Sequence, residues 1–366
     1  MLKKLLVVLL CFSVCSGCQK QKLELYKNAT LQDSFDTVFT FSAYAHSQEE
    51  FDAWFALFKE ELTSYHRLYD IYHDYSGLNN LKTINDNAGI QPVVVDRKII
   101  DLLLFAKEWY DKTEGFCDIT MGPVLKIWHS YREAGILLNE DGEGGPLPNM
   151  EALEEAYQYT GWSHVIIDEA ASTVYLDIFE ASLDVGAVAK GYAVEQISLK
   201  LEEAGVLYGF VNGGGNVRTI HTKADGSSWN VGITVPDNLG ANIGVFAFGE
   251  SMSIATSGDY ERYYVDVNGD RQQHIIDPRT LMPVTTCRSV SVITTDAGIA
   301  DVLSTYFVIA GFDFADSKIQ ELQSQGIKVD LLWIYDQNVP EHHWDSYQYE
   351  TFTVLLTADL EAIRKK

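Results

Sequence analysis

Apolar residues recur at helical intervals in two stretches of the first third of the chain. Residues 47–66 (SQEEFDAWFALFKEELTSYH) predict a helix with one buried face, which carries Phe51, Trp54, Phe55, Phe58 and Leu62. Ser47, followed three residues later by Glu50, is the capping-box pattern that opens a helix. Residues 97–113 predict a second amphipathic helix, which ends before Gly115.

Strand patterns dominate the second half. Alternation begins early, at residues 35–45 (FDTVFTFSAYA), and further strand patterns follow at 206–212, 216–220, 242–249, 263–276 and 289–295. The pair Asn268-Gly269 predicts a tight hairpin, and a helix is expected from about Ile299 to Ala310. Helices and strands mix without a regular βαβ order, so we predict a single α+β domain with mixed sheets and flanking helices.

The N-terminus has the order of a secretory signal peptide, with a basic start, an apolar run and a small-residue pair over residues 1–17. Cys18 follows directly, as in a bacterial lipobox, where the cysteine becomes the lipidated first residue. Cys15 stands where lipoproteins usually carry leucine, and cleavage elsewhere to release a secreted protein is the alternative. We expect a lipid-anchored protein on the extracytosolic face of the cell membrane.

The expected organisation has four parts. The signal peptide (1–17) is followed by a lipidated tether over 18–32, one domain over 33–357 and a tail over 358–366. The glycine-rich stretch 140–149 (EDGEGGPLPN) is expected to be a surface loop within that domain.

Charge and cysteine content exclude two classes of function. The chain has 27 basic and 52 acidic residues and a net charge of −25, which repels the phosphates of nucleic acids. An anionic substrate would need a local device such as a metal ion, a lysine or a nest of backbone amides. Beyond Cys18 only Cys117 and Cys287 remain, so the expected domain has no CxxC motif and there is no basis for structural zinc in it.

Residues 183–197 (LDVGAVAKGYAVEQI) predict a strand that ends at Asp184, a Gly-Ala turn and a helix that begins near Lys190. This order directs backbone groups and a lysine at one point, as in phosphate sites, although the Walker A spacing is absent. A structural strand–turn–helix corner is the alternative. The glycines at 213–215 similarly allow the close approach of a flat ligand or a plain hairpin.

Asp301 and Thr305 are four residues apart and share one face of the predicted helix. The helix is otherwise apolar, so the carboxylate is expected to be buried and to need a partner. A carboxylate and a hydroxyl are hard oxygen ligands that suit Mg²⁺; a carboxylate that caps a backbone turn is the alternative. His274, expected on a strand before the Asp277-Pro278 turn, is a catalyst or an ordinary satisfied histidine.

Four motifs in a fixed order are more specific together than any one alone. They are DVGAVAKGYAVE (184–195), NGGGN (212–216), TSGDYERYY with HIIDPRT (256–280) and ADVLST (300–305). They resemble the ApbE family, the FAD:protein FMN transferases. The resemblance extends upstream to FDTVFTF, LYDIYHDYSGLNNLKTIND and FCDITMGPVLKIWH. Asp36 and Leu281-Met282 depart from the family's commonest pattern, which has glycine at 36 and directly after DPRT.

The resemblance implies Mg²⁺-dependent transfer of the FMN half of FAD onto a threonine (or serine) hydroxyl of a target protein, with release of AMP. It assigns the metal to the Ala187 carbonyl, Asp301 and Thr305. It makes His274 the general base, a task that suits the unperturbed histidine pKa of about 6.5. Flavin and adenine contacts map onto Phe35, Tyr72, Phe116, Cys117, Asp118, Asp184, Lys190 and Ile275.

The expected partners are FAD and an extracytosolic flavoprotein or membrane redox-complex subunit that carries the acceptor threonine. Two other activities remain open from the sequence. One is an FAD pyrophosphatase, in which water replaces the acceptor and the products are FMN and AMP. The other is a lipoprotein that binds flavin without catalysis.

Overall fold

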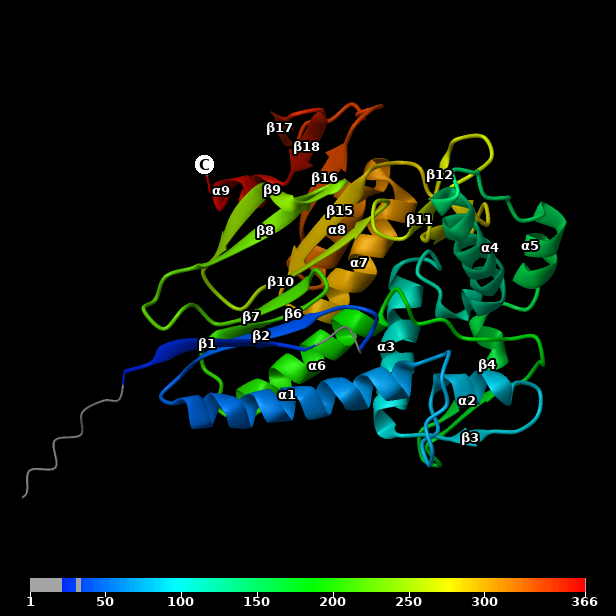
Figure 1. The fold of residues 1–366 in the computed structure, drawn as a ribbon, viewed down its shortest axis with the longest axis horizontal. Coiled ribbons are helices and arrows are strands. Elements are labelled where there is room, and N and C mark those ends of the chain that lie inside the picture. The colour runs from blue at the N-terminus through cyan, green and yellow to red at the C-terminus, as the bar shows by residue number, and fades with distance from the viewer. Residues whose placement is uncertain (1–21, 31–33, 366) are drawn as a thin grey trace, which may run out of the picture.

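The centre of the protein is a nine-stranded sheet (Figure 1). The structure is a computed structural model that describes residues 22–30 and 34–365. The predicted signal peptide and Cys18 lie outside the described residues. The strand order is β1-β2-β6-β7-β10-β15-β16-β18-β17, and neighbouring strands are antiparallel throughout. The strands are β1 (Glu24–Ala29), β2 (Phe39–Ala45), β6 (Gly209–Gly213), β7 (Asn216–Ile220), β10 (Ser253–Gly258), β15 (Ser289–Thr294), β16 (Asp330–Tyr335), β18 (Phe352–Leu356) and β17 (Asp345–Tyr349).

Three helices cover one face of this sheet. Helix α1 packs on β2, α6 on β6 and β7, and α7 on β10 and β15. Their bounds are α1 (Gln48–Tyr69), α6 (Ala189–Glu203) and α7 (Ala297–Ala310). The predicted cap of α1 is present, because Ser47 Oγ accepts from the Glu50 N–H at 3.1 Å, although the Glu50 carboxylate returns to the His46 N–H rather than to Ser47.

A long hairpin covers the opposite face of the sheet. It consists of β8 (Trp229–Val235) and β9 (Asn238–Phe248), and with α9 (Ala358–Ala362) it encloses a second apolar core. Alternate residues of β16 enter the two cores: Leu331 and Trp333 face the helices, and Leu332 and Ile334 face the hairpin. Burial of both faces explains why β16 is apolar almost throughout.

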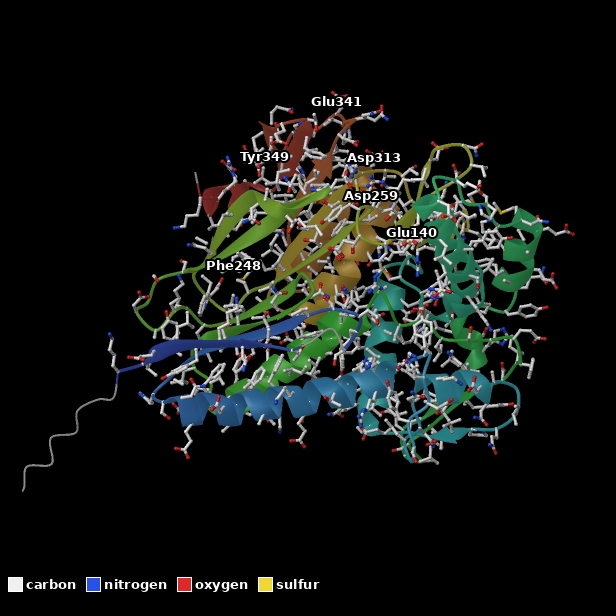
Figure 2. The ribbon with its side chains drawn as sticks, viewed as in Figure 1. Glu140, Phe248, Asp259, Asp313, Glu341 and Tyr349 are labelled. Atoms are coloured by element: carbon white, nitrogen blue, oxygen red, sulfur yellow. The ribbon has the colours of Figure 1, made fainter. Side chains whose placement is uncertain are left out.

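The remaining elements form a smaller layer beside the large sheet, on the right in Figure 1. A third apolar cluster lies there beneath α4 and α5 and includes Trp128 and Tyr264. Phe248 of β9 and Glu140 at the end of α4 lie on opposite sides of α7 (Figure 2). The elements are α2 (Leu81–Asp86), β3 (Val93–Val94), α3 (Arg97–Lys112), α4 (Gly122–Glu140), α5 (Met150–Tyr157), β4 (Val165–Asp168), β5 (Thr173–Leu176), β11 (Tyr263–Val265), β12 (Arg271–Gln273), β13 (Ile276–Asp277) and β14 (Met282–Pro283). Helix α8 (Ala315–Ser324) instead lies near α7 at the centre of Figure 1 and contributes Ile319 and Leu322 to the main core.

The mixture of helices and antiparallel sheets in one domain confirms the α+β prediction, but three expected strands differ. The strand expected from residue 35 begins at Phe39, because Phe35 and Asp36 form a turn with φ angles of 51° and 54°. Asp184 follows no strand; its N–H bonds the carbonyl of Ile119 at 2.8 Å. His274 lies between β12 and β13 rather than on a strand.

Both expected appendages contain packed structure. Residues 24–29, expected within the tether, form the edge strand β1. In the expected tail, Leu360 is fully buried and the N–H of Lys365 bonds the carbonyl of Val245 at 2.8 Å. The stretch 140–149 does connect α4 to α5 as a loop, and the Gly145 N–H fastens it to β11.

No single helix among the described residues is long and apolar enough to cross a membrane. The bent pair formed by 297–310 and 312–324 meets that test only when the two helices are taken together.

Candidate functional site

A cavity of about 600 Å³ lies between the helix layer and the smaller layer. This volume falls in the range of ligand pockets. The predicted site residues that line it are Phe35, Tyr72, Phe116, Cys117, Asp118, Asp184, Ala187, Lys190, His274, Ile275 and Thr305. Asp301 alone among the predicted ligands does not line the cavity; it is buried behind the wall at the contact between α6 and α7.

Asp301 joins two motifs that are 110 residues apart. Its Oδ2 accepts the N–H of Gly191 at 2.8 Å, so one oxygen makes the backbone contact that the sequence left as an alternative to metal binding. Burial raises the pKa of Asp301, while the charge of Lys190, the Gly191 N–H and the amide of Asn216 oppose that shift. Asn216 Nδ2 is buried and has no hydrogen-bond partner among the described residues.

Hydroxyl groups lie one turn further along α7. Ser257 Oγ on β10 contacts Ser304 Oγ at 2.8 Å and Thr305 Oγ1 at 3.4 Å. Thr305 and Ala187 both face the cavity. Among the described residues no group of three or more His, Cys, Asp or Glu side chains could hold a metal. The donors that the sequence predicts are one carboxylate, one hydroxyl and one carbonyl, an oxygen set that fits Mg²⁺ only if substrate and water complete its shell.

His274 is partly buried in the cavity wall, and its buried Nδ1 has no hydrogen-bond partner among the described residues. Burial lowers its pKa to about 3, and the charges of Arg262, Arg132 and Lys190 contribute to that shift. The pKa of His274 in the ligand-free site therefore lies below the unperturbed histidine value of about 6.5. The imidazole is neutral at pH 7, which is the form that can accept a proton.

Buried hydrogen bonds hold the aromatic side of the cavity. Asp70 accepts the N–H of Tyr72 at 2.7 Å and the hydroxyl of Tyr75 at 2.8 Å. His66 Nδ1 accepts the N–H of Phe35 at 3.3 Å. The Tyr72 ring, 53% exposed, stacks on His129 with ring centroids 5.4 Å apart. These contacts leave two rings available to pack against a flat ligand.

The segment Phe116 to Asp118 forms another part of the wall. The Cys117 thiol donates to the Val302 carbonyl at 3.3 Å, and burial raises the pKa of Cys117 well above its usual range. Cys117 is therefore a thiol that packs against α7, and it forms no disulfide with Cys287. Asp118 caps a short 3₁₀ turn through Thr120, and burial raises its pKa.

Sequence reasoning missed one complete wall of the cavity. Helix α4 lines it with Leu125, Trp128, His129, Arg132 and Glu133, whose spacing places them on one face of a helix. That periodicity could have revealed the cavity-facing side of the helix. These residues combine apolar, cationic and anionic side chains, however, so they do not form a uniformly apolar or uniformly charged stripe. Arg262, on the loop after β10, was also missed.

The described residues define an α+β protein with a large cavity, where aromatic rings and cations meet in front of the buried carboxylate of Asp301. The chain belongs to the ApbE family, whose model matches residues 35–329. The FAD:protein FMN transferase of Klebsiella pneumoniae (strain 342) is 28% identical over 277 residues, which are 75% of each chain. That of Treponema pallidum (strain Nichols) is 30% identical over 269 residues, which are 70% of each chain.

Solved structures agree with this assignment. The ApbE protein of Thermotoga maritima is 27% identical, with a TM-score of 0.73 that covers 94% of this chain and 100% of the other. The flavin transferase ApbE of Vibrio cholerae, at 21% identity, shares the fold with a TM-score of 0.72, covering 93% and 100% of the two chains.

The two departures from the commonest family pattern occupy left-handed backbone. Asp36 has φ 54° and Leu281 has φ 60°, a region where glycine carries no steric penalty and other residues do. Leu281 compensates with a buried side chain, and its carbonyl accepts the indole N–H of Trp128 at 2.8 Å. The departure at 281 is thus tied to a residue of the cavity wall.

Proposed function

We propose that this protein is an FAD:protein FMN transferase, which moves the FMN half of FAD onto a threonine or serine hydroxyl of a target protein and releases AMP. The observation that carries the proposal is a cavity lined by a neutral base, two of the three proposed oxygen ligands and stacked aromatic rings, with the third ligand, Asp301, buried behind its wall. Membership of the ApbE family and relatives named FAD:protein FMN transferases support it.

His274 is the proposed general base. A hydroxyl is a poor nucleophile at neutral pH, so its proton must be removed during attack. The hydroxyl oxygen forms a bond to the FMN-side phosphorus, the diphosphate P–O bond breaks, and AMP leaves with the bridging oxygen. The proton passes to His274 and then to solvent or product. Because diphosphate charge offsets Arg262, Arg132 and Lys190, bound FAD is expected to raise the pKa of His274 from its low ligand-free value.

Asp301, Thr305 and the carbonyl of Ala187 are the proposed holders of Mg²⁺. A magnesium ion there would neutralise charge on the diphosphate and on the transferring phosphoryl group. Lys190 stands at the start of α6 beside this set and adds a fixed positive charge. Phe35 and Tyr72 are positioned to pack against the flavin or adenine ring.

We also propose that the protein works outside the cytoplasm. The signal-peptide pattern and Cys18 support lipid attachment to the outer face of the cell membrane. An anchor there would hold the enzyme beside extracytosolic flavoproteins or redox-complex subunits that carry the acceptor threonine.

The deciding experiment combines the protein with FAD, Mg²⁺ and a flavoprotein domain that carries a candidate acceptor threonine, and reads the products by mass spectrometry. We expect the acceptor to gain the mass of one FMN, with an equal amount of AMP, and EDTA to prevent both. Replacement of that threonine by valine is the matched control. AMP and free FMN without labelling would instead identify a pyrophosphatase, and intact bound FAD a flavin-binding protein.

A further inference from the structure

Two arginines and a lysine around the cavity make no direct ion pair with an acidic side chain of the described residues. Within the described chain, Arg132, Lys190 and Arg262 take part in none of the ion pairs that most other basic residues form. The protein has 52 acidic residues available to neutralise 27 basic ones. Acidic residues are plentiful in this protein, yet these three cations form no ion pair. Their shared position on the cavity therefore suggests that they serve a ligand there.

Arg132 is held in place by its neighbours on α4. Its Nη2 donates to His129 Nδ1 at 2.7 Å, so this nitrogen is an acceptor and the His129 proton lies on Nε2. His129 Nε2 in turn contacts Glu133 Oε1 at 3.0 Å. These two contacts in series, from Glu133 to His129 to Arg132, fix one edge of the Arg132 guanidinium. Arg132 and Glu133 both line the cavity. The other donors of the guanidinium have no acceptor among the described residues.

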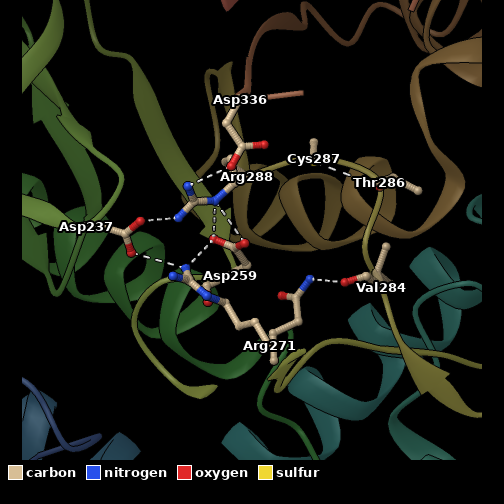
Figure 3. A network of polar contacts seen from close by, with 9 residues as sticks. Asp237, Asp259, Arg271, Val284, Thr286, Cys287, Arg288 and Asp336 are labelled. Carbon is tan, nitrogen blue, oxygen red and sulfur yellow. Dashed lines mark hydrogen bonds and ion pairs between the residues drawn. The ribbon is translucent and has the colours of Figure 1, made fainter. Parts of the chain in front are cut away.

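Arg262 reaches the cavity from the loop that follows β10. The loop is anchored by Asp259, which accepts two hydrogen bonds from Arg288 Nε at 3.0 Å and one from Arg271 Nη1 at 3.2 Å (Figure 3). Arg288 also contacts Asp237 and Asp336, so one charged network joins the loop to the β8–β9 turn and to β16. An anchored loop can present Arg262 to a ligand without first becoming ordered.

The two arginines repel each other. Burial lowers the pKa of Arg132, and the positive charge of Arg262 is the next cause of that shift. Both charges also act on Asp184 and His274, and all four residues line the same cavity. The carboxylates of Asp184 and Glu133 act in the opposite direction, but the pKa of Arg132 is still lowered, so a dianion between the two arginines would reduce the repulsion further.

We propose that Arg132 and Arg262 form a metal-independent subsite for the diphosphate of FAD. The planar guanidinium groups offer paired N–H donors that match phosphate oxygens. The adjacent Tyr72–His129 stack provides a ring surface for the nucleotide that carries this diphosphate. The subsite selects phosphorylated flavins over riboflavin and adds to the binding of the diphosphate by the metal. It rests on the proposed function only because FAD is taken as the ligand.

The test measures binding to the full-length protein by titration calorimetry in EDTA, with FAD, ADP and riboflavin as separate probes. The variants are Arg132→Met, Arg262→Met and the double variant. Loss of one charge-assisted contact of about 1.5 kcal/mol weakens binding roughly tenfold. We therefore expect about tenfold weaker FAD and ADP binding in each single variant, a larger loss in the double variant, and unchanged riboflavin binding. Arg97→Met, which removes an exposed charge on α3, is the control for net charge.

Three results would overturn the proposal. The double variant could bind FAD in EDTA as tightly as the wild type does, or it could lose riboflavin affinity by the same factor as FAD. Alternatively, the wild type could bind FAD only when Mg²⁺ is present. Thermal melting of each variant shows whether it is folded. The transfer assay on the wild type separates the two proposals. The wild type can transfer FMN even if the arginines do not bind the diphosphate, and the arginines can bind it even if no transfer occurs.

Discussion

The backbone N–H of Gly191 donates to Oδ2 of Asp301 at 2.8 Å and ties the start of α6 to the middle of α7. Gly191 has no space for a side chain, because a Cβ there would lie 2.3 Å from the Ala297 carbonyl oxygen and 2.4 Å from Asp301 Cβ. The close approach of these helices therefore depends on glycine at this position. It places the proposed metal ligand beside Lys190.

Gly191→Ala is expected to push α6 and α7 apart. Backbone atoms cannot give way easily, so the free energy of unfolding should fall by roughly 1–3 kcal/mol, as in overpacked cores. Denaturant unfolding measures this loss. Gly249→Ala is the matched control, since a Cβ there meets only Ser228 Oγ at 3.5 Å. Equal stability of the two variants would show that the helix contact is not tight.

Asp301→Asn should remove the response to Mg²⁺ and leave the fold intact, because the amide oxygen can still accept the Gly191 N–H. Turnover with Mg²⁺ is expected to fall to the level seen with EDTA. Product formation across a magnesium titration is the measurement. Asp296→Asn, which keeps an N-cap oxygen on α7, should retain the metal response. If turnover of the Asp301→Asn variant still depended on Mg²⁺, Asp301 would not be a metal ligand.

His274→Ala should separate binding from chemistry. We expect FAD affinity to change little and the transfer step to slow by about 10²–10⁴-fold, the usual contribution of a positioned base. Calorimetry and single-turnover kinetics give the two quantities. A variant that transfers FMN at the wild-type rate would exclude His274 as the base.

The burial of His274 also predicts how stability depends on pH. Its pKa is about 3 in the folded protein, against 6.5 as its ordinary value. Between these values the unfolded chain binds a proton that the folded chain does not, so the contribution to stability is complete above pH 6.5 and is lost as the pH falls toward 3. The wild type should therefore lose unfolding free energy more steeply than His274→Gln between pH 7 and pH 4. Parallel curves would contradict the buried neutral state.

Arg288→Met should loosen the loop that carries Arg262. The Asp259 carboxylate, mostly buried, would keep only Arg271 as a partner, and an under-compensated buried charge destabilises by about 3 kcal/mol. Weaker FAD binding should accompany the lower melting temperature. The exposed pair of Arg97 and Asp101 supplies the control, since Arg97→Met should change the stability by less than about 1 kcal/mol.

Local patterns predicted the elements whose structure depends on near neighbours. Helix α1 follows its apolar stripe, β7 occupies the predicted 216–220, and the turn that contains Asn268 and Gly269, with a φ of 87° at Gly269, joins β11 to β12 as an antiparallel hairpin. The family could be identified from four motifs, because the chemistry requires particular residue types in a fixed order. These features can be read from the chain because each depends on a few consecutive residues.

Contacts between distant segments decided the rest. The pKa of His274 depends on Arg132, 142 positions earlier in the chain, as well as on nearby Arg262. The strands expected at Asp184 and His274 are absent, since a short apolar run does not reveal whether a partner strand lies beside it.

The sequence by itself determined the family, the α+β class and the residue types of the proposed chemistry. Only the tertiary structure decided that Asp301 meets Gly191, that α4 forms one wall of the cavity, and that two unpaired arginines face the same ligand space. Burial and electrostatic interactions act through space over several ångströms, and the fold alone sets which distant residues share that space.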